Sequence, residues 1–311
     1  MGRIVVVGSS NVDLIMKVGR LPLPGESVSG GVFTQTYGGK GANQAVGAAR
    51  SGSDVCFVSC LGADGFAPDF IKNFEKDGID TQHVLQKEGA PTGTALIMID
   101  AQGENCISAA PGANNELKPE DIDRVEPTLR EADMIVLQYE VHPDTVRYVI
   151  DRGAALGKKV LFNLAPAQAL EKEYLEKLHT LVVNESEAAL LLQEPVSGLE
   201  DAPAAVDKLK ESVNGCVILT LGAAGSYIAD GDLRKLIPAF KVEAVDTTAA
   251  GDVYCGSLAT ALVEGKSILE AVRFASAASA ITVTRLGAQP SAPSREEIDS
   301  FLSSAASLEA Q

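Results

Sequence analysis

Two aspartates flank a run of small residues near the end of the chain. Residues 246–252 read Asp-Thr-Thr-Ala-Ala-Gly-Asp, after a β-prone segment at 240–245 and before a small-residue helix predicted at 250–263. The start of a helix attracts anions through its free N–H groups and its positive dipole end, and small side chains let a phosphate approach the backbone. A carboxylate there would normally repel that phosphate. We therefore interpret Asp252 as a base for a hydroxyl group that attacks the phosphate.

The same loop has a simpler explanation, and the motif alone leaves both open. Asp252 could be an acid in the first turn of an ordinary capped helix, where it would stabilise the helix dipole. Under the catalytic interpretation, the N–H groups of Ala249, Ala250 and Gly251 would hold the transferring phosphoryl group in an anion hole. Beside a helix start, Asp252 is expected to have a low pKa, which phosphoryl transfer tolerates because positioning matters most.

Polar or glycine-rich loops follow at least five predicted strand ends. In open parallel sheets, the carboxyl ends of the strands meet at the edge that binds ligands. Each loop could instead be a turn, a helix cap or a capping box, so their convergence carries more weight than any one loop. The loops are Asn11-Val12-Asp13, residues 37–44 with Lys40 and Asn43, Glu140, Asn184-Glu185-Ser186-Glu187 and residues 220–226.

Two of these loops suggest a particular ligand chemistry. In residues 37–44, three glycines surround Lys40 and would let a polar ligand approach, with Lys40 and Asn43 donating to its hydroxyl groups. The loop is not a Walker A motif, because no Ser or Thr follows the lysine. In the loop at 184–187, the alternative to a capping box is a carboxylate, Glu187, that holds hydrated Mg²⁺ near phosphates.

The elements that must position these loops alternate between strands and helices. From about residue 116 this alternation predicts a doubly wound α/β fold, with a mostly parallel central sheet and helices on both faces. Earlier strands at 12–18, 28–36 and 94–109 are more polar, which predicts a separate small β-sheet lid over the ligand. We find no linker or internal repeat, so residues 1–311 are predicted to form a single domain with the lid inserted. The open edges of the lid strands invite a second chain, so we expect a homodimer through the lid.

Composition excludes several classes of protein. The chain has 311 residues, 46% of them hydrophobic, and its net charge of −16 would repel a nucleic-acid backbone. No apolar run approaches the roughly 20 residues needed to span a bilayer, and the first residues do not match a signal peptide. The five scattered cysteines form no metal-binding pattern and are interpreted as reduced thiols. These features predict a cytoplasmic protein with neither a nucleic-acid nor a membrane partner.

Taken together, the segments resemble the ribokinase family of sugar kinases over nearly the whole chain and in the same order. The most specific segments are Gly38-Gly39-Lys40-Gly41-Ala42-Asn43-Gln44-Ala45 and the loop at 246–252, and residues 284–291 are also similar to the family. Many members have glycine where this chain has Ala249. That loop is expected to act through its backbone N–H groups, so the extra methyl group puts little in doubt.

The resemblance implies a reaction and three sets of site residues. It implies transfer of the γ-phosphoryl group of ATP to the 5-hydroxyl of D-ribose, with Mg²⁺ and a monovalent cation, usually K⁺. Asn11, Asp13, Gly39, Lys40, Asn43, Glu140 and Asp252 would bind the pentose. Asn184, Thr220, Gly222, Ala224, Gly225, Gly251 and Ser276 would line the ATP site, with Glu187 organising Mg²⁺, and Ser276 stands where some members have histidine near the adenine. Asp246, Thr248, Thr282, Arg285, Gly287 and Ser291 would hold K⁺, mostly through carbonyl oxygens.

Two alternatives remain at this stage. The first is a kinase of the same fold that acts on deoxyribose, fructose or a nucleoside. The second is a sensor of nucleotide or sugar without catalytic activity. Asp252 and Glu187 argue against a sensor, since a sensor needs no base.

Overall fold

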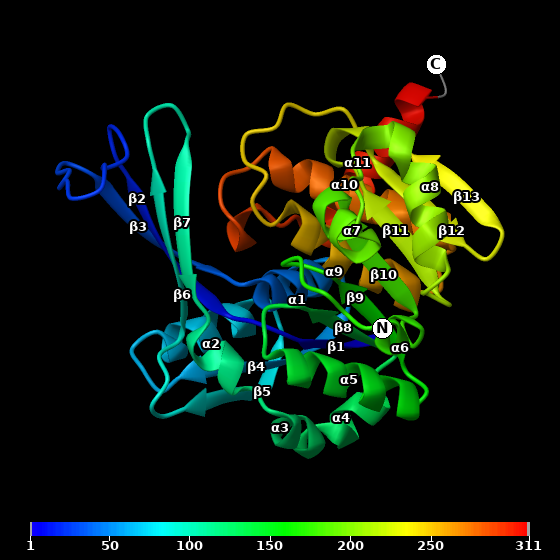
Figure 1. The fold of residues 1–311 in the computed structure, drawn as a ribbon, viewed down its shortest axis with the longest axis horizontal. Coiled ribbons are helices and arrows are strands. Elements are labelled where there is room, and N and C mark those ends of the chain that lie inside the picture. The colour runs from blue at the N-terminus through cyan, green and yellow to red at the C-terminus, as the bar shows by residue number, and fades with distance from the viewer. Residues whose placement is uncertain (1, 310–311) are drawn as a thin grey trace.

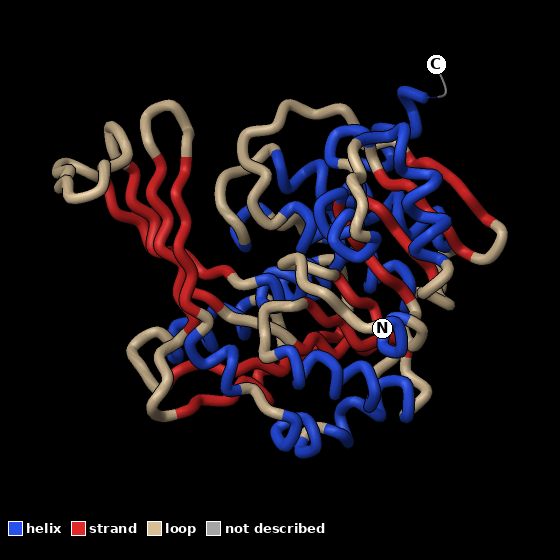
Figure 2. The backbone as a smooth tube through the Cα atoms, viewed as in Figure 1, coloured by secondary structure: helices blue, strands red, loops and turns tan. Residues whose placement is uncertain are grey.

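The computed structural model describes residues 2–309 and contains two sheets. The larger sheet has nine strands, and its β-branched segments form the buried centre of the molecule (Figures 1 and 2). Its strands are β1 (Arg3–Val7), β4 (Asp54–Gly62), β5 (Asp80–Lys87), β8 (Met134–Gln138), β9 (Lys159–Asn163), β10 (Thr180–Asn184), β11 (Cys216–Thr220), β12 (Ser226–Asp230) and β13 (Leu233–Ile237). They lie in the order β13-β12-β11-β10-β9-β8-β1-β4-β5, and all neighbours pair in parallel except β11 with β12 and β12 with β13, so among these described strands only β12 runs in the opposite direction.

The order of the strands creates a crevice for a ligand. Strand β1 pairs with β4 on one side and with β8 on the other, and the later strands β9 to β11 continue outward from β8. Connections from β1 and β8 therefore leave the sheet in opposite directions. Open α/β sheets bind ligands at such a switch point, outside the carboxyl ends of the strands.

Helices cover both faces of this sheet. Alternate residues of each strand face opposite sides, so Ile4 and Val6 of β1 belong to one core cluster and Val5 and Val7 to the other. The first cluster packs against α1 (Lys40–Arg50), α2 (Ala67–Lys76), α9 (Ala250–Val263), α10 (Ile268–Val283) and α11 (Arg295–Glu309). The second packs against α3 (Pro119–Arg124), α4 (Glu126–Glu131), α5 (Pro143–Ala155), α6 (Lys172–Leu175), α7 (Glu185–Leu192) and α8 (Gly198–Lys210). The doubly wound α/β fold predicted from the sequence is confirmed.

The second sheet projects away from the body (Figures 1 and 2). It contains β3 (Val32–Gly38), β2 (Asn11–Lys17), β6 (Gly93–Ile99) and β7 (Asn105–Ala110), in that order. The 3₁₀ turn η1 (Gly112–Glu116) leads from β7 back to the body, and two further 3₁₀ turns are η2 (Gly222–Ala224) and η3 (Gln289–Ser291). The small sheet predicted from the sequence is therefore present, although β3 begins four residues later than expected.

Three local predictions were wrong or incomplete. The β-prone segment at 240–245 is irregular, because residues 238–244 lie outside both sheets and reach α9 as a loop. The strand predicted at 28–36 begins only at Val32, after Gly30 and Gly31. The edge strands β5, β12 and β13 had no distinct signal in the sequence. No helix in the described part of the chain combines the length and apolar character required to span a membrane.

Candidate active site

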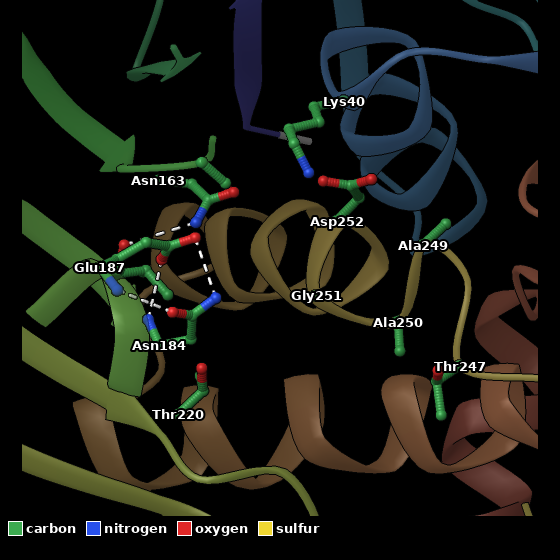
Figure 3. A pocket seen from close by; sticks show the side chains of 12 residues that line it. Lys40, Asn163, Asn184, Glu187, Thr220, Thr247, Ala249, Ala250, Gly251 and Asp252 are labelled. Carbon is green, nitrogen blue, oxygen red and sulfur yellow. Dashed lines mark hydrogen bonds between the residues drawn. The ribbon is translucent and has the colours of Figure 1, made fainter. Parts of the chain in front are cut away.

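Asp252 lies in the first turn of α9 and is almost fully buried, with 7% of its surface exposed. Asn43 Nδ2 donates to Asp252 Oδ2 at 2.9 Å, and Gln44 Nε2 donates to Asp252 Oδ1 at 3.4 Å. In Figure 3 the Lys40 side chain points toward the same carboxylate. The structure therefore joins the two most specific segments of the sequence, which are 209 positions apart at Asn43 and Asp252.

The low pKa expected for Asp252 is wrong. Burial raises its pKa above the ordinary value of 3.8 and outweighs the attraction of Lys40 and the hydrogen bond from Asn43, which both lower it. The helix dipole is evident from the sequence, but the burial of the side chain is not, and burial disfavours the charged form. A raised pKa makes Asp252 a stronger proton acceptor than the sequence argument assumed.

A cavity of about 220 Å³ opens directly over the start of α9. Ala249, in the left-handed conformation with φ 60°, ends the loop so that the first turn of the helix faces the cavity. The N–H of Ala250 donates to the Thr247 carbonyl at 3.3 Å, at the long end of the normal range. The cavity is lined by Lys40, Asn163, Ala165, Val182, Asn184, Glu187, Thr220, Thr247, Ala249, Ala250, Gly251 and Asp252.

Glu140 accepts hydrogen bonds from polar residues that follow β1 and β3. Its Oε2 accepts hydrogen bonds from Ser9 Oγ at 2.6 Å, from the Lys40 N–H at 3.0 Å and from Asn11 Nδ2 at 3.5 Å. Asn11 is held in turn by Asn114 Nδ2, which donates to Asn11 Oδ1 at 2.8 Å. Residues predicted from three separate loops therefore form one polar wall.

Asp13 lies on the same wall, on strand β2 of the small sheet. Burial, with the nearby charge of Glu140, raises the pKa of Asp13 to about 7. The neighbouring loop approaches closely only because it is made of glycine. A side chain at Gly38 would lie about 2.3 Å from Asp13 Oδ2, and Gly39 has φ 93°.

A second cavity of about 460 Å³ shares Thr220, Thr247, Ala250 and Gly251 with the first. Its walls come from α10, from the loop at 239–244 and from the turn after β11, and they are largely apolar. Of the residues predicted for the nucleotide, Thr220, Gly222, Gly225, Gly251 and Ser276 line it, whereas Ala224 lines neither cavity. Two connected cavities, one polar and one apolar, suit a ligand with a charged end and a flat apolar end.

The comparisons with known proteins agree with this geometry. Residues 1–295 match the family described as pfkB family carbohydrate kinase. The chain belongs to the pfkB family of carbohydrate kinases. It is 38% identical over 299 residues to a ribokinase of Haemophilus influenzae, covering 96% of this chain and 98% of the relative. It is also 38% identical over 301 residues to a deoxyribokinase of Salmonella typhimurium, with the same coverage.

A solved structure shares the fold of this pfkB kinase. The structure of a ribokinase of Arabidopsis thaliana complexed with ribose and ATP has a TM-score of 0.90 and 32% identity, covering 97% of this chain and 99% of that one. The chain is a sugar kinase, as its sequence predicted.

In this pfkB kinase, Glu187 and Asn184 form a complete capping box. Asn184 donates to both carboxylate oxygens of Glu187, from its backbone N–H at 2.8 Å and from Nδ2 at 2.9 Å (Figure 3). The carboxylate is nevertheless buried at the cavity wall, and burial raises its pKa. The helix-cap and ligand-facing interpretations of this loop are therefore compatible.

The residues predicted for K⁺ lie outside both cavities, where two loops meet. Asp246 joins these loops, because its carboxylate accepts from the Thr248 N–H and the Gly287 N–H, both at 2.9 Å. Burial alone would raise the pKa of Asp246, but the hydrogen bonds from Thr248 and Gly287 lower it overall. Nearby, the Arg285 N–H donates to the Thr282 carbonyl, and Ser291 Oγ donates to the Ala288 carbonyl at 2.6 Å.

Sequence reasoning missed four polar residues of the site. Ser9 and Asn114 support the wall around Glu140, and Gln138 and Asn163 lie under Asp252 at the carboxyl ends of β8 and β9. Gln138 and Asn163 had the same signal as the others, a polar residue at the end of a buried strand. Asn114 had none, because its partner Asn11 is 103 positions earlier in the chain.

Proposed function

We propose that this chain transfers the γ-phosphoryl group of ATP to the 5-hydroxyl of D-ribose, giving D-ribose 5-phosphate and ADP. The observation that carries the proposal is the position of Asp252, a buried carboxylate between a polar wall and the cavity at the start of α9. The Haemophilus relative is a ribokinase, and the Arabidopsis structure holds ribose and ATP. Both support ribose and ATP as the substrates here.

The polar wall offers groups that need partners. Within the described part of the chain, Asn43 Oδ1 is buried without a hydrogen-bond partner. Such an orphaned acceptor is costly unless a ligand satisfies it. We assign the pentose to this wall, with Asn43, Asn11, Asp13 and Glu140 bonding its hydroxyl groups and Gly39 allowing close approach. Lys40 would donate to the oxygen atoms around the reacting hydroxyl.

The mechanism follows from the environment of Asp252. The carboxylate accepts the proton of the attacking hydroxyl as the oxygen bonds to phosphorus, and the bond to the ADP oxygen breaks. The first turn of α9, with the N–H groups of Ala249, Ala250 and Gly251, stabilises the charge on the transferring phosphoryl group. Because Asp252 lines the cavity and is hydrogen-bonded to Asn43 on the side of the wall, the sugar and the phosphate would reach the base from its two sides.

The nucleotide is assigned to the two connected cavities. Its triphosphate would lie along Asn184, Thr220 and Gly251, and its base would lie in the apolar cavity beside Ser276, between the turn at 222–225 and α10. The buried carboxylate of Glu187 fits a nearby cation, because an opposite charge offsets the cost of burying it. Mg²⁺ bound there, through its water shell, would neutralise phosphate charge.

A monovalent cation is assigned to the two loops joined by Asp246. Carbonyl and carboxylate oxygens are the ligands that hard cations prefer, and the Asp246 carboxylate lies between these two loops. We propose that K⁺ binds between Asp246, Thr248, Thr282, Arg285, Gly287 and Ser291, and that it keeps the loop before α9 in place.

Deoxyribose is the second candidate acceptor, because the Salmonella deoxyribokinase is as similar to this chain as the Haemophilus ribokinase. Among the described residues, the wall has one buried acceptor without a partner, Asn43 Oδ1, and a site built to bond a hydroxyl group rejects an analogue that lacks it by about 10⁴-fold in favourable cases. An additional sugar hydroxyl to satisfy this acceptor favours ribose. Comparison of kcat/KM for ribose and 2-deoxyribose decides between them.

The position of the phosphate tests the reaction itself. Phosphorus NMR of the product formed from ribose and Mg·ATP should show a 5-phosphate monoester. A 1-phosphate would contradict the assignment of Asp252 beside the 5-hydroxyl. If fructose or a nucleoside were the best acceptor, it would replace ribose as the proposed substrate.

We also propose a homodimer in the cytoplasm, formed through the small sheet. Phe33 and Leu96 are each 56% exposed and belong to strands β3 and β6 of that sheet. Their partners across the ladder, Met16 and Leu14, lie on the same face of neighbouring β2. A second copy of this sheet would bury these apolar side chains.

A further inference from the structure

We propose that Gln44 is a positioning residue for this reaction: its side-chain amide clamps one oxygen of Asp252 and fixes the direction in which the base meets the sugar hydroxyl. The inference rests on the proposed function, since it names what holds the base of that reaction. Gln44 lies in α1 and is fully buried. Its Nε2 donates to Asp252 Oδ1 at 3.4 Å.

Two amides hold the two oxygens of the carboxylate separately. Asn43 Nδ2 bonds Oδ2 and Gln44 Nε2 bonds Oδ1, so adjacent residues of one helix grip both sides of Asp252. The last torsion of an aspartate side chain has a broad energy minimum, so a single contact leaves the carboxylate free to rotate. With both contacts, its plane is fixed relative to the cavity.

The amide of Gln44 is itself fixed by the central sheet. Gln138 Nε2 donates to Gln44 Oε1 at 2.7 Å, and Gln44 Nε2 donates to Asn163 Oδ1 at 3.1 Å. Gln138 and Asn163 are direct partners in the β8–β9 ladder, at the carboxyl ends of both strands. A donor on one side and an acceptor on the other permit one orientation of the Gln44 amide. The sheet therefore orients Gln44, and Gln44 orients Asp252, before any substrate binds.

The charges around Asp252 make this clamp matter for its protonation. The ionisable groups facing it are Lys40 on α1, Glu140 after β8, Glu187 on α7 and Cys255 on α9. Burial raises the pKa of Asp252, and the hydrogen bond from Gln44 is one of the few influences that lower it. Loss of that N–H should therefore raise the pKa of Asp252 further.

The test is Gln44→Met, which keeps the length of the side chain and removes both hydrogen-bonding ends. The variant should fold cooperatively, with kcat reduced about 10- to 100-fold and both KM values nearly unchanged, because a displaced base affects the transition state more than binding. The acid limb of the pH profile of kcat, which reports the base in the enzyme–substrate complex, should move to higher pH. Gln86→Met, at an exposed position of β5, is the matched control and should leave both quantities unchanged.

Two further variants keep the test decisive. Gln44→Glu preserves the shape but places a like charge beside Asp252, and should move the acid limb further in the same direction. Gln138→Met removes the hydrogen bond to Gln44 Oε1, which acts on Asp252 only through Gln44, so its effect on kcat should be smaller. The double variant Gln44→Met with Gln138→Met should reduce kcat by less than the two single effects combined.

The outcomes distinguish the role of Gln44 from the proposed reaction. Folded Gln44 variants with the kcat and acid limb of the wild type would overturn the role of Gln44, as would fully additive effects of Gln44→Met and Gln138→Met. A wild-type protein without sugar-dependent ADP release would overturn the proposed function and this role with it.

Discussion

Two carboxylates in the site carry raised pKa values for the same physical reason. Asp252 and Asp13 are both withdrawn from water, and each faces the charge of Glu140. In Asp252 the attraction of Lys40 and two amide donors work against burial, whereas Asp13 has no comparable cation among its influences. The proposed acceptor site therefore contains one acid suited to accept a proton during the reaction and one that titrates near neutral pH.

Asp252→Asn tests the base. The substitution preserves the shape and removes the proton acceptor, so we expect kcat to fall about 10²- to 10⁴-fold. Because the ionised form of a group with a raised pKa destabilises the fold at high pH, the variant should unfold at the same temperature as the wild type or higher at pH 8. Calorimetry measures the unfolding temperature, and a coupled ADP assay measures kcat. Near-wild-type turnover would refute the assignment of Asp252 as the base.

Asp13 predicts a pH dependence of sugar binding. Its pKa of about 7 means that Asp13 is protonated in half of the free enzyme at that pH. A protonated carboxyl is a poor acceptor of hydrogen bonds from sugar hydroxyl groups. We expect kcat/KM for ribose to fall as the pH drops below about 7, with a smaller change in kcat, and Asp13→Asn should remove this limb. A profile that is flat down to about pH 5.5 would contradict it.

Stability should respond to Asp13 with the opposite sign to an ordinary salt-bridged acid. Between its ordinary value of 3.8 and about 7, the folded protein binds more protons than the unfolded chain. The free energy of unfolding therefore falls as the pH rises through this range. Asp13→Asn should raise the unfolding temperature at pH 8 and leave it unchanged near pH 4.

At the scale of elements, the starts of three helices and the loops beside them determine what the site can bind. Strands β1, β8, β9, β10 and β11 end at one edge, where α1, α7 and α9 begin. This convergence was predictable, because hydrophobic strands and polar strand ends are both local patterns. The loop at 238–244 was not predictable, because Phe240 and Val242 look β-prone but line the second cavity instead of pairing in a sheet. Tertiary packing there overrides local preference.

The contacts beneath the site could be predicted only in part. A polar residue at a strand end could be noted for Gln138 and Asn163, but their shared contact with Gln44 depends on sheet register and helix rotation. The capping box of Asn184 and Glu187 was readable because it spans three positions. Asp246 bridging to Gly287 spans 41 positions, and only the resemblance to a family suggested it.

The cation loops give a prediction at this scale. Asp246→Asn keeps the size of the side chain but removes one of the two oxygens that hold Thr248 and Gly287. We expect the K⁺ concentration for half-maximal activity to rise several-fold, with little change in the KM for ribose. Titrating KCl at constant ionic strength, and monitoring unfolding temperature in KCl and NaCl, measures this. If neither the activity nor the unfolding temperature of the wild type depends on K⁺, the proposed cation site is wrong.

At the scale of the molecule, the small sheet is the part least protected by the body. It projects from the switch point, with both edge strands β3 and β7 open, and carries Phe33 and Leu96 on one face. Asp13 lies on the opposite face of β2, because side chains alternate along a strand. The same sheet could therefore contribute to the sugar site with one face and to a dimer with the other.

A dimer through this face is testable by mass. Light scattering at micromolar concentration should give twice the 32.4 kDa of one chain. Phe33→Asp combined with Leu96→Asp should give the monomer with its fold intact, because a charge cannot be buried there cheaply. The pair Leu190→Asp and Leu199→Asp, at exposed positions on α7 and α8, is the control. A monomeric wild type would contradict the dimer.

The central claim is ribose-dependent phosphoryl transfer from ATP, and ADP release tests it most directly. Purified protein with Mg·ATP in KCl should release ADP rapidly when D-ribose is present and only slowly without it, because the acceptor is the sugar hydroxyl rather than water. The ratio should be far smaller for Asp252→Asn. Equal ADP release with and without ribose, or none in either case, would contradict the account.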